Sequence, residues 1–263
     1  MTLTPTTAMP VATIKGLLLD IDGVLFQADQ ALPGAGEALG RLRAARMPFR
    51  LITNTTRTPK ADLLAKLERL GLAVAGRELV TTGEIARDVL ARDRARPYLL
   101  VHENLRSDCP AEAEEPDSVL IGDAGDGFTY GRLNRAFRIL LEGGRLYALA
   151  RNRYFRGPDG LDLDAGPFVA ALEYASGVEA RVLGKPDPTF FRTAAASAGL
   201  APARTLMVGD DVEADILGAR GAGFEAVLVR TGKFREPDAA KALEGGAHVR
   251  PSIVEVVDEL LVP

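Results

Sequence analysis

The sequence lacks several features that would assign it to particular classes of protein. It has a single cysteine, Cys109, so it cannot form an internal disulfide. No apolar run approaches the roughly 20 residues that are needed to cross a bilayer. The opening MTLTPTTAMP has neither a basic start nor an apolar segment, which predicts a frayed tail rather than a secretory signal peptide. Together these absences predict a cytoplasmic protein with no membrane partner.

An excess of positive charge is absent as well. The 263 residues include 32 Lys and Arg against 36 Asp and Glu, and the resulting net charge of -4 argues against a nucleic-acid partner. Hydrophobic residues make up 47% of the chain and charged residues 26%, which is typical of a folded globular protein. The length allows one large domain or two modest ones.

The segment KGLLLDIDGVLF, residues 15–26, carries the strongest local signal. Its apolar run is typical of a strand that is buried on both faces in a parallel sheet. The run ends at Asp20 and Asp22, which share one side of the strand because they are two residues apart. Gly23 then permits a sharp turn. Two carboxylates so placed repel each other, and a dication or a proton relieves the repulsion; taken alone, the motif is equally consistent with a simple turn.

Short apolar strands alternate with amphipathic helices along the chain, which predicts an α/β fold with a doubly wound, Rossmann-like parallel sheet. The pattern changes in the middle of the chain and then resumes. We therefore predict a core domain formed by residues 1–83 and 181–263, with a smaller α/β domain inserted at 84–180. The expected strands are 17–21, 49–52, 79–82, 98–101, 119–121, 146–150, 180–183, 205–208 and 226–229. The expected helices are 33–47, 59–70, 83–93, 129–142, 166–176, 188–198, 216–221 and 252–261.

Polar residues follow four of the expected strands: Asp20 and Asp22, Thr53 and Asn54, Lys185, and Asp210 and Asp211. In an open parallel sheet the ligand crevice lies beyond the carboxyl ends of the strands, so these groups can converge although they are far apart in sequence. Each of them alone has an ordinary explanation, such as a helix cap or a solvated side chain. Their joint occurrence predicts a site for a divalent cation and a phosphate group.

This set of side chains suits the hydrolysis of a phosphate ester. Mg²⁺ held by Asp20 and Asp210 would offset the repulsion between an attacking carboxylate and a phosphate dianion. Asp20 would be the nucleophile and form an aspartyl-phosphate. Asp22 would protonate the leaving oxygen and then activate the hydrolytic water. The phosphoryl oxygens would be bound by donors at the other strand ends, Thr53, Asn54 and Lys185.

Four segments, DIDGVL, TNTTR, VLGKPDPTFF and MVGDDVEAD, resemble in this order the four motifs of the haloacid dehalogenase-like hydrolases. The place of the insertion resembles the type IIA branch of that family, which carries an α/β cap between the second and third motifs. The resemblance extends over almost the entire chain. It implies a Mg²⁺-dependent phosphatase in which the backbone carbonyl of Asp22 joins Asp20 and Asp210 at the metal. It also implies that Asp211 and Asp215 lie outside the direct ligands or on metal-bound water, that the cap closes over the site, and that the protein forms a homodimer.

Asp22 bears on the choice of substrate. Some members of this branch carry Ser at its position, which suits phosphoramidates or pyrophosphate because their leaving groups need little protonation. Asp22 therefore predicts activity on ordinary phosphate monoesters of small molecules. Candidates for substrate contact in the cap are the loop 123–128 and Arg151, Arg153 and Tyr154, although a solvated surface explains these residues equally well.

Other functions remain open at this point. One alternative is a phosphatase for phosphoramidates and pyrophosphate, such as phosphohistidine and phospholysine. Another is a phosphate-binding protein without catalytic activity. A phospho-accepting signalling domain fits less well because it is about half this length and lacks an insertion. A true dehalogenase fits less well because the doubled acid Asp210-Asp211, together with Asp22, indicates a metal.

Overall fold

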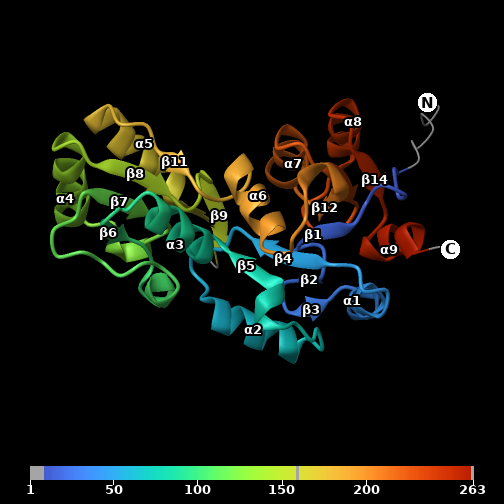
Figure 1. Ribbon diagram of the computed structural model, residues 1–263. Helices are drawn as coiled ribbons and strands as arrows, with labels where there is room; N and C mark the ends of the chain where they lie inside the picture. The colour runs from blue at the N-terminus through green and yellow to red at the C-terminus, as the bar shows by residue number, and fades with distance from the viewer. Residues whose placement is uncertain (1–8, 158–159, 262–263) are drawn as a thin grey trace. The chain divides into compact units, whose positions relative to one another are not determined.

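The computed structural model describes residues 9–157 and 160–261 (Figure 1). The chain divides into two compact units: the first comprises Met1–Thr53, Leu64–Val80 and Lys185–Pro263, and the second comprises Asn54–Leu63 and Thr81–Gly184. The second unit thus covers the insertion predicted at 84–180 and adds a short earlier segment. Most of the predicted N-terminal tail, together with Pro158 and Asp159, lies outside the described residues.

The first unit is built on a six-stranded sheet with the strand order β14-β13-β12-β1-β4-β5. Four pairs of neighbouring strands are parallel: β14 with β13, β13 with β12, β12 with β1, and β1 with β4. The predicted α/β fold with a parallel sheet is therefore confirmed. The strands are β1 (Gly16–Asp20), β4 (Phe49–Thr53), β5 (Leu79–Thr81), β12 (Thr205–Gly209), β13 (Glu225–Val229) and β14 (His248–Arg250).

β1 lies in the interior of this sheet, and all five of its residues are buried. It pairs with β12 on one side and with β4 on the other, so that Leu19 lies opposite both Val208 and Leu51. A strand with neighbours on both edges and helices on both faces has no side exposed to water, which explains its unbroken apolar run. This register also brings the carboxyl ends of the three strands to the same edge of the sheet.

Helices cover both faces of the six-stranded sheet. In Figure 1, α6 to α8 lie on one side of the strands and α1 and α9 lie on the other, and α6 packs against β1 and β4 while α1 packs against α9. These helices are α1 (Ala35–Ala44), α6 (Pro188–Ala196), α7 (Gly218–Gly221), α8 (Glu236–Glu244) and α9 (Ile253–Leu261). Among the helices of the described residues, none is long and apolar enough to span a membrane.

The second unit has its own parallel sheet, with the order β11-β8-β7-β6, and a separate antiparallel hairpin of β9 and β10. Helices α4 and α5 pack together over an apolar core of this unit, where Phe128 stacks on Phe168 with ring centroids 3.7 Å apart. The elements are β6 (Pro97–Leu100), β7 (Ser118–Ile121), β8 (Arg145–Ala148), β9 (Tyr154–Gly157), β10 (Gly160–Leu163), β11 (Arg181–Val182), α3 (Thr82–Arg92), α4 (Tyr130–Leu141) and α5 (Ala165–Ser176).

One expected strand joins a different sheet from the one predicted. Residues 180–183 were expected to resume the sheet of the core, whereas β11 pairs with β8 in the sheet of the second unit. Two pairs define the register, Arg181 with Tyr147 and Val182 with Ala148. A short apolar run predicts that a strand forms but not which edge it will join, because every open edge offers the same backbone groups.

Cys109 provides a test of the packing in the second unit. The side chain is buried, and burial raises the pKa of its thiol to about 11. At pH 8 such a thiol is about 0.1% ionised, against about 25% for a solvated cysteine. We expect a disulfide reagent such as DTNB to react with the native chain at least about a hundredfold more slowly than with the chain unfolded in guanidinium chloride. Equal rates in the two states would contradict the burial of this side chain.

Candidate active site

A buried ion cluster lies at the carboxyl edge of the six-stranded sheet. Asp20 is the last residue of β1, and Lys185 lies just before α6. The Lys185 ammonium donates to Asp20 Oδ1 at 2.7 Å and lies 2.6 Å from Asp215 Oδ1. The side chains of all three residues are less than one tenth exposed. A buried cation between two carboxylates restricts the orientation of both, because a side chain that turned away would leave its charge buried without this partner.

Asp210 enters the same cluster from the end of β12. Its Oδ2 accepts a hydrogen bond of 2.7 Å from the backbone amide of Lys233. Its Oδ1 is buried and has no hydrogen-bond partner among the described residues. A buried carboxylate oxygen without a donor is costly unless a ligand occupies the position.

Two glycines press against the Asp210 carboxylate. Gly23 and Gly232 both have positive φ, +80° and +63°, and a Cβ on either of them would lie 2.0 Å from Asp210 Oδ2. The Thr231 hydroxyl donates to the Gly23 carbonyl and so joins the two turns. Glycine is needed here both for the left-handed backbone and for the space.

The electrostatics of the cluster favour an additional positive charge. Burial raises the pKa of Asp210 to about 7 and that of Asp215 to about 6, and in both cases the Asp20 carboxylate adds to the shift. Burial by itself lowers the pKa of Lys185, but Asp20 and Asp215 outweigh it and raise the pKa above its ordinary value. Three carboxylates therefore share one ammonium, and a bound divalent cation would relieve the repulsion that remains.

The geometry fits that requirement. Asp20, Asp210 and Asp215 each offer a carboxylate oxygen within 4.8 Å of the others, and all three residues are buried. Hard divalent cations prefer such carboxylate oxygens. The family resemblance implied a place for Asp215 outside the direct ligands or on metal-bound water, whereas the structure groups one of its oxygens with those of Asp20 and Asp210.

Asp211 has a different position from its neighbour. Its Oδ1 accepts hydrogen bonds from the backbone amides of Glu213 and Ala214 at 3.1 and 3.0 Å, and so caps the π-helical turn η5 (Val212–Leu217). Its own amide donates to Asp215 Oδ2 at 3.2 Å. Asp211 therefore positions Asp215 through the backbone, and it is not part of the group of three ligand oxygens.

The remaining predicted residues lie at the ends of two strands. Thr53 is the last residue of β4 and is buried, one position beyond Ile52, which is paired with Asp20. Asn54 follows it directly and is the first residue of a segment that belongs to the second unit. The side chain of Asp22 is exposed, while its backbone forms a bridge to Phe26. The roles of these residues toward phosphate and metal stay predictions.

The segment Thr231-Gly232-Lys233 was not assigned a role from the sequence. It follows β13, which ends at the same edge of the sheet as β1, β4 and β12, and it contributes a hydroxyl, a glycine and an amide around Asp210. The signal that was available is a Thr-Gly pair at the end of a buried parallel strand, where a tight turn close to a ligand is expected.

A substitution at Gly232 tests this packing. The Cβ of Gly232→Ala would lie 2.0 Å from Asp210 Oδ2 and 2.5 Å from the Gly23 Cα, so the loop or the carboxylate must move. A displacement of about 1 Å in a catalytic group typically costs about 10²-fold in rate, and we expect at least that loss in kcat. Gly221→Ala is the matched control, because its Cβ would meet nothing within 4 Å. Equal activity of the two variants would contradict the role of the glycine pair.

In the second unit, the loop proposed for substrate contact is held by an arginine. The Arg57 guanidinium makes a bidentate contact with the buried Asp123 carboxylate and lies 4.5 Å from the centre of the Phe155 ring. Asp123 Oδ1 also accepts a hydrogen bond of 2.9 Å from the Gly125 amide. Arg151, another proposed contact, forms an ion pair of 2.6 Å with Glu173. Asp123 and Arg151 thus each contact a side chain of opposite charge within the second unit.

Two family models match this chain. The model described as haloacid dehalogenase-like hydrolase matches residues 17–112, and a related model of the HAD hydrolases matches residues 182–256. The chain is 43% identical over 249 residues to the human haloacid dehalogenase-like hydrolase domain-containing protein 2, with 94% of this chain and 96% of the relative covered. The chain belongs to the haloacid dehalogenase-like hydrolases. The resemblance seen in the four sequence motifs is therefore confirmed.

Other relatives and structural neighbours of this hydrolase carry the names of phosphatases. It is 40% identical over 258 residues to the phospholysine phosphohistidine inorganic pyrophosphate phosphatase of Bos taurus, covering 95% of this chain and 96% of the relative. The 4-nitrophenylphosphatase of Thermotoga maritima superposes with a TM-score of 0.85 at 28% identity, covering 95% and 98%. A glycerol phosphate phosphatase of Mycobacterium tuberculosis, solved in complex with magnesium, superposes at 0.81 with 27% identity, covering 93% and 77%. The chain is therefore an enzyme of the phosphatase type.

Proposed function

We propose that this hydrolase is a Mg²⁺-dependent phosphatase that acts on small phosphorylated substrates through an aspartyl-phosphate on Asp20. The observation that carries the proposal is the buried group of Asp20, Asp210 and Asp215 with Lys185 beside it. These three carboxylates would hold Mg²⁺, whose charge offsets the repulsion between the nucleophile and the phosphate dianion. The unpartnered Oδ1 of Asp210 supports this assignment.

Different residues of the chain carry out the separate tasks of the reaction: orienting the nucleophile, transferring protons and binding the phosphoryl group. Lys185 holds Asp20 Oδ1 and thereby orients the carboxylate for attack on phosphorus. The bond from the Asp20 oxygen to phosphorus forms while the bond from phosphorus to the leaving oxygen breaks. Asp22, whose side chain is exposed, would give its proton to the leaving oxygen, and as a carboxylate it would then take a proton from the water that hydrolyses the intermediate. The oxygens of the phosphoryl group would be bound by Thr53, Asn54 and Lys185.

Asp22 favours phosphate monoesters with poor leaving groups, since these require a strong general acid. The alternative is a preference for phosphoramidates or pyrophosphate, which the name of the bovine relative suggests. The test is phosphate release from a sugar phosphate, pyridoxal phosphate, p-nitrophenyl phosphate, pyrophosphate and phosphohistidine, first with Mg²⁺ and then with EDTA. Release from any of them that EDTA abolishes supports the proposal, and no release from any would favour a phosphate-binding protein.

The variant Asp22→Ser separates the two preferences. We expect kcat to fall about 10²- to 10⁴-fold on the sugar phosphate, because protonation of the leaving alkoxide is lost. The fall on p-nitrophenyl phosphate, pyrophosphate and phosphohistidine should be much smaller, because their leaving groups need little protonation. Asp29→Ser is the control, since Asp29 is an exposed acid in the same segment. A uniform loss on all substrates would contradict the role of Asp22 as general acid.

Two further properties belong to the same proposal. The resemblance implies a homodimer, and the composition implies a cytoplasmic enzyme. Light scattering coupled to size-exclusion chromatography would give the mass in solution directly, against 28.0 kDa for the monomer.

A further inference from the structure

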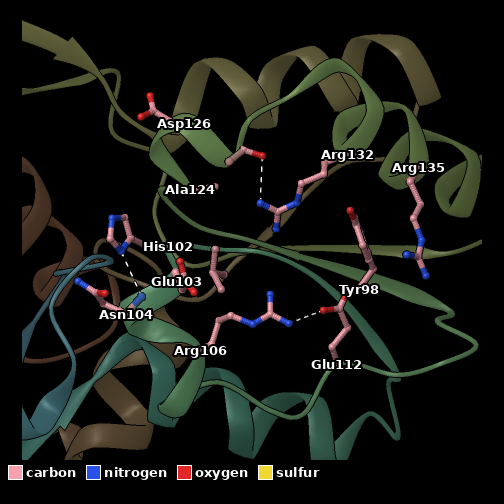
Figure 2. Close-up of a pocket in the computed structure, with 12 residues that line it drawn as sticks. Tyr98, His102, Glu103, Asn104, Arg106, Glu112, Ala124, Asp126, Arg132 and Arg135 are labelled. Atoms are coloured by element: carbon pink, nitrogen blue, oxygen red, sulfur yellow. Dashed lines mark hydrogen bonds and ion pairs between the residues drawn. The ribbon is translucent and has the colours of Figure 1, made fainter.

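The second unit contains a cavity of about 600 Å³, whose lining includes part of the loop 123–128 that was considered above for substrate contact. Its lining comes entirely from this unit, from β6, the loop after β7, the first turns of α4 and the segment 102–112 (Figure 2). The volume lies within the usual range of about 300 to 1,000 Å³ for small-molecule sites. It includes none of the acids of the active site.

Two arginines of α4 supply positive charge to the lining of the cavity. Arg132 and Arg135 are three residues apart and therefore lie on the same side of the helix. Figure 2 shows the Tyr98 hydroxyl directed into the space between their guanidinium groups. The Arg135 guanidinium lies 4.7 Å from the centre of the Tyr98 ring, so the ring fixes its position as well.

Arg132 is anchored without being neutralised. Its guanidinium donates to the backbone carbonyls of Leu99 at 2.9 Å and of Gly127 at 3.1 Å. A guanidinium has five N–H donors, so several remain for another partner. A carbonyl carries only a partial charge, and the positive charge is therefore not cancelled. A charged donor held in place before binding loses little freedom when an anion arrives.

The charges around the cavity are unevenly distributed. Arg106 forms an ion pair with Glu112. Within the described ranges, neither Arg132 nor Arg135 forms an ion pair with a carboxylate. The exposed acid Asp126 lies at the opposite end of the lining from Arg135 in Figure 2. The exposed acid Glu103 also lines the cavity. The end near Arg135 therefore offers a hydroxyl and guanidinium groups that have no carboxylate partner among the described residues, while Asp126 and Glu103 are carboxylate acceptors elsewhere in the lining.

We propose that this cavity is a second binding site, for a small organic anion whose phosphate or carboxylate group binds Arg132, Arg135 and the Tyr98 hydroxyl. Guanidinium groups bind both kinds of anion through paired N–H donors. Hydroxyl or ammonium groups elsewhere on the ligand would face Asp126. None of the acids of the phosphatase centre lines this cavity, and the proposal does not depend on the function proposed for that centre.

The site is tested by titrating the protein with inorganic phosphate and with succinate in the presence of EDTA. The two titrations show whether the site binds a phosphate group or a carboxylate group. The chain contains no tryptophan, so Asn104→Trp places a single fluorescent reporter at the rim of the cavity. Calorimetry on the unaltered protein verifies that the reporter does not itself create the site. Saturation with phosphate alone assigns a phosphorylated ligand, with succinate alone a carboxylate ligand, and with both a general anion site.

Matched variants identify the residues responsible. In the reporter protein, Arg135→Gln should weaken binding about tenfold or more, because one charged donor pair is lost. Arg138→Gln is the control: Arg138 is also exposed on α4 but does not line the cavity, and binding should stay within about twofold. Tyr98→Phe keeps the buried ring, removes only the hydroxyl and should also weaken binding. No saturation with either anion, or equal binding by the Arg135 and Arg138 variants, would overturn the proposal whatever the outcome of the phosphatase assays.

Discussion

Asp20→Asn is expected to reduce phosphate release by at least about 10⁴-fold at saturating Mg²⁺, because the amide cannot form the aspartyl-phosphate. The substitution keeps the size of the side chain, so the core around β1 should be preserved. The measurement is steady-state kcat on whichever substrate of the panel the native protein hydrolyses best. Thermal unfolding in the same buffer establishes that the variant is folded.

Asp29→Asn is the control for this prediction. It makes the same chemical change nine residues later, at an acid whose side chain is 92% exposed and forms an ion pair with Lys66. Its activity should match that of the native protein. If Asp20→Asn and Asp29→Asn were equally active, the nucleophile would have to be another group, and the mechanism proposed above would fail.

Lys185→Met is expected to have the second large effect, on stability as well as on activity. The ammonium lies between Asp20 and Asp215, and its removal leaves buried carboxylates without their cation. Breaking a buried pair in this way typically costs about 3–5 kcal/mol of unfolding free energy. Urea unfolding at neutral pH in EDTA measures this loss, and kcat should fall together with it because the donor that we propose for the phosphoryl group is lost.

The response to Mg²⁺ shows whether Lys185→Met loses stability because a buried positive charge is missing or because the side chains around it pack less well. A cation bound among the remaining carboxylates would restore part of the lost stability, so added Mg²⁺ should stabilise Lys185→Met by more than it stabilises the native protein. Lys241→Met is the control, because its ion pair with Glu213 is exposed and worth at most about 1 kcal/mol. A Lys185 variant as stable as the Lys241 variant would contradict the buried cluster.

The sequence predicted the parts of the site whose signal is local. Each of Asp20, Thr53 and Asp210 lies at the end of a buried parallel strand, and an apolar run that stops at a polar residue is visible without any structure. The convergence of Asp20 and Asp210 then follows from a general property of parallel sheets, since the carboxyl ends of the strands share one edge. Lys185 reaches them by another route, because the strand before it, β11, belongs to the sheet of the second unit.

The contribution of Lys233 could not be predicted in the same way. It reaches Asp210 through its backbone amide, and every residue except proline has one. The position of Asp215 depends on the π-helical turn that Asp211 caps, which places it nearer the cluster than its distance in sequence indicates. In both cases the contact is made by a backbone amide. The sequence specifies side chains and does not show which backbone amides will make such contacts.

The strands that were missed have weak sequence signals for physical reasons. β14 is an edge strand of three residues, His248–Arg250, and two of these are polar. The hairpin of β9 and β10 pairs only with itself, and β10 is largely exposed, so no apolar run marks it. Pairing partners and exposure, rather than intrinsic propensity, decide whether such segments form strands.

The contact of Arg57 with Asp123 limits where the chain of this enzyme can be cut into fragments or exchanged with that of a relative. Arg57 belongs to the segment Asn54–Leu63, whereas the rest of the second unit is the continuous stretch Thr81–Gly184. A recombinant fragment cut at the ends of that stretch would leave behind the guanidinium that neutralises a carboxylate only 3% exposed. Transplanting the cap of a relative onto this chain, to change the range of substrates, therefore requires the donor's own version of residues 54–63 as well as the insertion.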